Sequence, residues 1–143
     1  MEAIDPADLA PIIFEHDRES AFIEYKGCLG WNELEPRGKR EIVRDLLGMG
    51  NGDSTGYIVF GVAQGPGASL DRKGLTAAQA GSFDPSPIGE LVREYADPEV
   101  RFTVHQPTLR DLRFVVLRVA PFSSVPHICR RSYDSVLEQA AIY

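Results

Sequence analysis

The most constraining feature of the sequence is an apolar run, Tyr-Ile-Val-Phe-Gly-Val-Ala, at residues 57–63. An apolar run of this length, without polar alternation, is typical of a strand that is buried on both faces of a sheet. Residues 50–56 precede it and are rich in Gly, with Asn, Asp, Ser and Thr among them, which favours a turn. The sequence therefore predicts a central strand with other elements packed on both of its sides.

A second strand is predicted over residues 21–26, where aromatic and β-branched side chains alternate with charged ones. Because successive side chains of a strand point to opposite faces, Glu24 and Lys26 share one face while Ile23 and Tyr25 share the other.

Two helices are predicted from apolar positions at the helical period. The first covers residues 37–49, and the second runs from Pro87 or Ile88 to Tyr95. Their buried positions are Ile42, Val43, Leu46 and Leu47 in the first helix, and Ile88, Leu91, Val92 and Tyr95 in the second.

The remaining segments complete one sheet. Residues 100–106 and 113–120 read as an antiparallel hairpin, and residues 140–143 as the start of a last strand. Residues 64–87 form a long irregular connection in which residues 76–80 could hold one helical turn. The predicted class is α+β, with a single mixed or antiparallel sheet and two main helices packed on it.

Composition indicates one globular domain of 143 residues, with 43% hydrophobic and 25% charged residues. No apolar run is long enough to span a membrane, and no secretory signal is visible. We therefore expect a cytoplasmic protein with no membrane partner. Its two cysteines, Cys28 and Cys129, are expected to be reduced thiols.

The net charge of −6 is concentrated near the N-terminus, because residues 1–24 hold seven acids and one base. Residues 25–143 carry 14 acids and 14 bases, so the rest of the chain is neutral. Local basic patches matter more for phosphate contacts than the total charge does. The candidate nucleic-acid-binding cations are Lys26, Lys39, Arg40, Arg44, Arg130 and Arg131, although a single cation of this kind is more often a solvated surface charge.

Three segments, in this order, resemble the Schlafen-type AlbA family, which is also described as a divergent ATP-binding domain of bacterial proteins. They are Glu-Ser-Ala-Phe-Ile-Glu-Tyr-Lys at residues 19–26, the turn and Gly-led strand at 46–62, and the strand and Pro-His loop at 114–127. The polar composition of residues 1–18 predicts an acidic arm or a short helical turn. The resemblance implies an AlbA domain at 19–143, truncated at its C-terminal end. It also implies that the chain is a nucleic-acid-interacting part, binding RNA or DNA, of a larger bacterial protein.

In nuclease members of that family, two Glu and a downstream Asp bind a divalent metal. The resemblance assigns Glu19 and Glu24 as metal ligands for Mg²⁺ or Mn²⁺ and as catalytic residues, and Lys26 of the same segment is a further catalytic candidate. Such carboxylates would suit a metal-dependent endoribonuclease. The chain departs from the pattern where the third acid is expected, because Ala-Gln-Gly stands at residues 63–65. The sequence therefore favours nucleic-acid binding over nucleic-acid cleavage.

Two further hypotheses stay open. The turn containing Asn51, Gly52 and Gly56 could present backbone N–H groups to an anion or nucleotide, although no Gly-Lys-Ser/Thr is present. The second open hypothesis is that the chain is a protein-interaction or homo-oligomerisation module. For nucleic-acid binding itself, Trp31 or Tyr57 could stack on a base.

Overall fold

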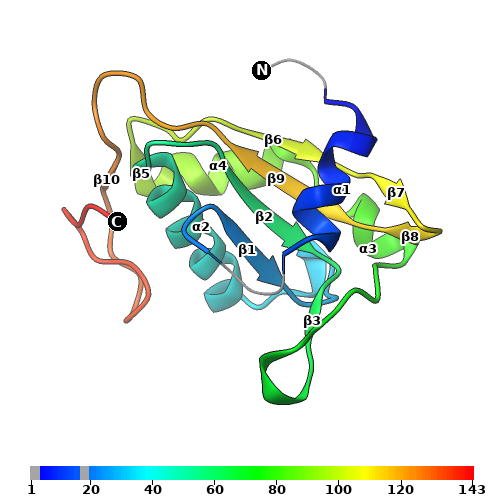
Figure 1. The fold of residues 1–143 in the computed structure, drawn as a ribbon. Helices are drawn as coiled ribbons and strands as arrows, with labels where there is room; N and C mark the ends of the chain where they lie inside the picture. Colours follow the sequence, from blue (N-terminus) through cyan, green and yellow to red (C-terminus); the bar gives the residue numbers. More distant parts are fainter. Residues whose placement is uncertain (1–3, 17–19) are drawn as a thin grey trace.

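A mixed four-stranded sheet forms the centre of the computed structural model, which describes residues 4–16 and 20–143 (Figure 1). The strand order is β1-β2-β9-β6, with β1 parallel to β2 and the other two pairs antiparallel. This confirms the predicted α+β class and the predicted pairing of the hairpin strands. The strands are β1 (Ile23–Lys26), β2 (Gly56–Phe60), β6 (Phe102–His105) and β9 (Val115–Val119).

The central strand is buried on both faces, as its composition predicts. Ile58 and Phe60 belong to one hydrophobic core and Val59 to the other, and none of the three is more than 1% exposed. The prediction that this strand continues to residue 63 is wrong. Gly61 turns the chain with φ of +109°, and a side chain at that position would meet the Phe114 ring at 2.9 Å.

Two helices, α2 (Pro36–Gly50) and α4 (Pro85–Tyr95), pack on one face of the sheet and bury the predicted apolar positions except Leu91, which is half-buried. The predicted start of the second helix is late by two or three residues. The Asp84 side chain accepts a hydrogen bond from the Ser86 N–H at 3.0 Å, so the helix begins at once after Asp84.

The opposite face is covered in part by α1 (Pro6–Phe14), which begins after Asp5 as its N-cap. Leu9 and Ile13 are at most 1% exposed and belong to the second core. The Phe14 ring packs edge-on against Phe114, with ring centroids 5.5 Å apart. Within the segment predicted as an acidic arm, residues 6–14 thus form a helix packed on the sheet.

Short elements fill the connections. The predicted irregular stretch contains a small hairpin and the predicted helical turn, which is capped by Thr76 through its hydrogen bond with the Gln79 N–H at 3.1 Å. The short elements are η1 (Trp31–Glu33), β3 (Ala63–Gln64), η2 (Pro66–Ala68), β4 (Leu70–Asp71), α3 (Ala77–Gly81), β5 (Ala96–Asp97), β7 (Thr108–Leu109), β8 (Leu112–Arg113) and β10 (Ile128–Cys129).

The predicted strand at residues 140–143 is wrong. Ala140 has φ of +70°, which is outside the range of a strand. The chain instead turns back on Cys129, whose carbonyl accepts from the Ala140 N–H at 2.7 Å and whose N–H donates to the Ala141 carbonyl at 2.9 Å.

No helix within residues 4–16 and 20–143 is both long enough and apolar enough to cross a membrane.

Candidate nucleic-acid interface

The cations predicted on α2 lie against the C-terminal segment of the chain, which runs beside this helix (Figure 1). Arg37 forms an ion pair with Asp134 at 3.2 Å. Arg40 lies over the Tyr133 ring at 4.6 Å and donates from Nε to the Tyr95 hydroxyl at 3.3 Å. These contacts give both guanidinium groups a role in holding the fold together.

The other predicted cations also meet partners within the chain. Arg44 lies over the Tyr143 ring at 5.1 Å, and Lys39 lies over the Trp31 ring at 5.3 Å. Trp31 is only 6% exposed, so little of its ring is available to a nucleobase.

The second predicted basic pair lies beyond the end of β10. Arg131 forms an ion pair with Glu94 on α4 and lies 6.0 Å from the Tyr95 ring centroid. Arg130 has an exposed side chain, while its backbone N–H donates to the Tyr95 carbonyl at 2.8 Å. This pair is therefore anchored at the C-terminal end of α4.

Asn51, predicted as part of an anion-binding turn, instead forms hydrogen bonds to two segments that are distant in sequence, at His127 and at Tyr143. Its Nδ2 donates to the carbonyls of His127 at 2.8 Å and Tyr143 at 3.1 Å, and its Oδ1 accepts from the His127 N–H at 2.6 Å. The His127 side chain is buried, with Nδ1 2.7 Å from the Pro98 carbonyl. The polar atoms of the Asn51 side chain are thus engaged inside the protein.

The two glycines of the same turn lie close to Met49. The Gly52 N–H donates to the Met49 carbonyl at 3.0 Å. Gly56 is the first residue of β2, and a side chain there would meet Met49 Cβ at 2.8 Å. The requirement for glycine at position 56 therefore has a packing cause.

A cluster of charged side chains lies between β1 and α2. Glu24 and Lys26 point to the α2 side of the sheet, as the alternation predicts. Lys26 Nζ lies 2.8 Å from Asp45 Oδ2 and 3.6 Å from Glu24 Oε1. A cavity of about 280 Å³ opens onto Glu24, Arg44 and Asp45. Asp45 was missed by sequence reasoning, although an acid beside the buried Leu46 of a helix signals a nearby cation.

The predicted metal ligands can be placed only in part. Glu19 lies outside the described residues. Within residues 4–16 and 20–143, no group of three or more His, Cys, Asp or Glu side chains could hold a metal ion. Glu24 and Asp45 therefore contribute two carboxylates, with the Lys26 ammonium close to both.

On the face that carries α1, this helix covers only part of the sheet (Figure 1). The part that α1 leaves uncovered, here called the open part, forms a second polar surface. The strand register places Tyr57, Arg118 and Thr103 directly opposite one another on β2, β9 and β6. All three are half-buried. We call these three residues the sheet-face row. It combines an aromatic ring, a guanidinium and a hydroxyl without a carboxylate.

Arg118 differs from the α2 cations. Its Nε is shielded from water, and among the described residues it has no hydrogen-bond partner. A shielded polar group without a partner is costly, so this guanidinium, unlike those on α2, is not accounted for by hydrogen bonds, ion pairs or ring contacts among the described residues. Sequence reasoning missed this residue, although a single Arg in the strand Val115–Val119 signals that one face of the sheet is open at that position.

His105 borders the sheet-face row. Its Nε2 lies 2.8 Å from Thr103 Oγ1, and the strand register places it next to the buried Val116. Burial, and then the positive charge of Arg118, lower the pKa of His105 below its ordinary value of 6.5. The imidazole is therefore neutral at neutral pH.

This shift predicts a pH dependence of stability. The unfolded chain takes up a proton at higher pH than the folded chain does, so the unfolding free energy falls as pH drops below about 6.5. We expect urea denaturation at a series of pH values to show this loss in the wild type and a smaller loss in His105→Gln. Identical pH profiles for the two proteins would contradict the assignment.

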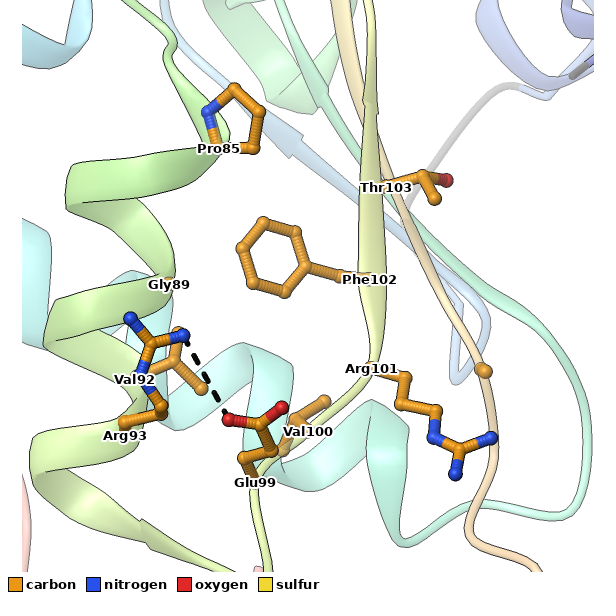
Figure 2. Close-up of a pocket in the computed structure, with 10 residues that line it drawn as sticks. Pro85, Gly89, Val92, Arg93, Glu99, Val100, Arg101, Phe102 and Thr103 are labelled. Atoms are coloured by element: carbon orange, nitrogen blue, oxygen red, sulfur yellow. Dashed lines mark ion pairs between the residues drawn. The ribbon is translucent and has the colours of Figure 1, made fainter. Parts of the chain in front are cut away.

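Two cavities adjoin the sheet-face row at the start of β6. Figure 2 shows Phe102 reaching toward α4, while Arg101 and Thr103 leave β6 on the other side. The cavity beside Phe102 has about 400 Å³, and the ion pair between Arg93 and Glu99, at 3.8 Å, lies at its border. A second cavity of about 460 Å³ lies between Arg101 and the loop at residues 121–127.

The fold and the surface together define an α+β domain with a mixed sheet, helices on both faces and an aromatic–cationic row on its open part. No protein-family model matches the sequence, and no curated protein matches it. The chain is similar in structure to the N-terminal domain of a protein from Nitrosomonas europaea that is named as related to the ATP-dependent DNA helicase RecG. The TM-score is 0.52 at 18% identity, over 85% of this chain and 76% of that one. This likeness establishes a shared fold.

Proposed function

We propose that the chain binds single-stranded nucleic acid on the open part of its sheet. The observation that carries the proposal is the sheet-face row, in which the aromatic ring of Tyr57 lies directly opposite the guanidinium of Arg118. Single strands bind where an aromatic ring can stack on a base and a nearby cation can meet the phosphate backbone. A base on Tyr57 would place its phosphate near the half-buried guanidinium of Arg118.

Two further facts support this proposal. The structural neighbour belongs to a protein whose name relates it to a DNA helicase. The three segments that resemble the Schlafen-type AlbA family fall on β1, on α2 with β2, and on β9 with the loop after it. We therefore propose that the chain is a divergent AlbA-type domain of a larger, cytoplasmic bacterial protein.

The test is an anisotropy titration of labelled RNA and DNA, each as a single strand and as a duplex. We expect the single strands to bind more tightly than the duplexes, because only unpaired bases can stack on Tyr57. Affinity should fall with salt because phosphate contacts release counterions. A protein that binds neither strand at low salt would contradict the proposal and turn attention to a nucleotide or to self-association.

The cluster at Glu24, Lys26 and Asp45 favours a second candidate function, metal-dependent cleavage of RNA. Carboxylate oxygens suit Mg²⁺ or Mn²⁺, and such an ion would stabilise charge on the phosphate while water attacks phosphorus and a P–O bond breaks. The residues that would hold the ion are Glu24 and Asp45, while Arg44 lines the same cavity and could meet the phosphate. The proximity of Lys26 to both carboxylates competes with the ion.

Cleavage predicts a specific mutational result. Incubation of single-stranded RNA with Mn²⁺ should yield fragments that disappear with EDTA, in Glu24→Gln and in Asp45→Asn. Glu90→Gln, an exposed position on α4, is the matched control and should cleave as the wild type does. Fragments that persist in Glu24→Gln would show that this cluster is not the cleavage site. Intact RNA with the wild type would contradict cleavage and leave nucleic-acid binding as the proposed function.

A further inference from the structure

The cavity of about 460 Å³ next to the sheet-face row could extend the proposed nucleic-acid site, and its role there rests on the proposed function. It is lined by Arg101, Ala120 and the loop at residues 121–127. The Ala120 N–H donates to the Arg101 carbonyl at 3.0 Å, so this pair lies two positions along the strands from the pair formed by Thr103 and Arg118. The cavity therefore lies next to the sheet-face row along β6 and β9, and the side chain between them at Ala120 is small.

Phe122 places an aromatic side chain among the residues that line this cavity. Phe122 is 36% exposed, so part of its ring is available to a ligand in the cavity. The backbone of Phe122 is held in place, because its N–H donates to the Gly50 carbonyl at 2.8 Å. The other end of the loop is held by the buried His127. The ring is thus presented by an anchored loop.

The charges around the cavity favour an anionic ligand with an apolar part. Arg101 is exposed and, as Figure 2 shows, leaves β6 on the side away from α4. The one carboxylate among the lining residues, Glu99, lies 3.8 Å from the Arg93 guanidinium, which offsets its charge. Ser123 and Ser124 add exposed hydroxyls that can donate to a base edge or a phosphate.

We infer that this cavity is a second base-binding subsite, in which Phe122 stacks on a nucleobase of the same strand that occupies the sheet-face row. Arg101 would meet the phosphate that links the two bound nucleotides. The ligand class is therefore a single strand long enough to cross from Tyr57 to Phe122. Its path runs over Arg118 and Ala120.

The test is a ladder of single-stranded oligonucleotides, from about two to about ten nucleotides, titrated into wild type, Phe122→Ala and Phe122→Tyr. We expect Phe122→Ala to lose about tenfold in affinity for the longest strands and to match the wild type on the shortest. Phe122→Tyr keeps the stacking ring and should bind as the wild type does. Phe22→Ala is the matched control, since Phe22 is 46% exposed and precedes β1 at the opposite edge of the sheet.

The outcomes separate this inference from the proposed function. If Tyr57→Leu weakens binding but Phe122→Ala matches the wild type at every length, the subsite is wrong and the proposed function stands. An equal loss for short and long strands in Phe122→Ala would also overturn the subsite, because the ring would then act on the first base or on the fold. If the wild type binds none of the strands, both proposals fail, and the exposed Phe122 would belong to a protein contact.

Discussion

Replacing Tyr57 by Leu is expected to weaken binding of single-stranded nucleic acid by about tenfold or more, because stacking on an aromatic ring contributes about 1–3 kcal/mol per base. Leu keeps an apolar side chain at this half-buried position, so the fold should persist. Tyr57→Phe is the matched control, since it keeps the ring, and it should bind nearly as the wild type does. The measurement is an anisotropy titration at fixed salt, accompanied by a denaturation curve for each variant.

Arg118→Gln tests the electrostatic half of the same site. Each phosphate contact on a single strand adds about 0.7 to the slope of log K against log salt concentration, so the variant should lose about that much. Arg130→Gln removes an exposed cation beside the C-terminal end of α4, which packs on the other face of the sheet, and should leave both slope and affinity unchanged. Because Tyr57 and Arg118 lie directly opposite each other, the effects of the two substitutions are not expected to add. A loss of affinity in Arg130→Gln that equals the loss in Arg118→Gln would contradict the site.

Asn51→Ala is expected to lower the free energy of unfolding by about 2–3 kcal/mol. The substitution removes three hydrogen bonds, at 2.8, 3.1 and 2.6 Å, and leaves the backbone groups of His127 and Tyr143 without partners. Asn32→Ala is the matched control, because Asn32 is exposed and its loss should cost little. Urea denaturation of both variants gives the comparison.

The same pair of variants decides between two interpretations of this turn. If Asn51 is a structural clamp, oligonucleotide affinity should be unchanged in Asn51→Ala at a temperature where the variant remains folded. If the turn instead binds an anion, Asn51→Ala should be as stable as Asn32→Ala and should bind more weakly. The second pattern would overturn the account given for Asn51.

The sequence predicts well those elements whose buried residues follow from the local spacing of apolar side chains. The two-sided burial of Ile58 and Val59 and the stripe ending in Leu46 and Leu47 follow from apolar spacing alone, and both are confirmed. The end of the chain could not be predicted in this way. A strand-like composition at residues 140–143 gives no sign of the left-handed backbone at Ala140, which depends on hydrogen bonds to the distant Cys129.

The candidate site shows the same division. Tyr57 can be recognised as a possible stacking residue, but its neighbours cannot, because Arg118 and Thr103 reach it only through the strand register. The cations of α2 form an evident cluster in sequence. Their partners, however, lie near the other end of the chain, as the ion pair between Arg37 and Asp134 illustrates. A basic cluster therefore does not by itself identify a surface that is open to a ligand.

The most direct test of the central claim is a nuclear magnetic resonance titration of the ¹⁵N-labelled protein with a single strand of about ten nucleotides. We predict that the amide shifts concentrate at Tyr57, Thr103 and Arg118, with a second group around Phe122. Shifts confined to residues 37–44 on α2, or no shifts at low salt, would contradict the assignment of the open sheet as the binding surface.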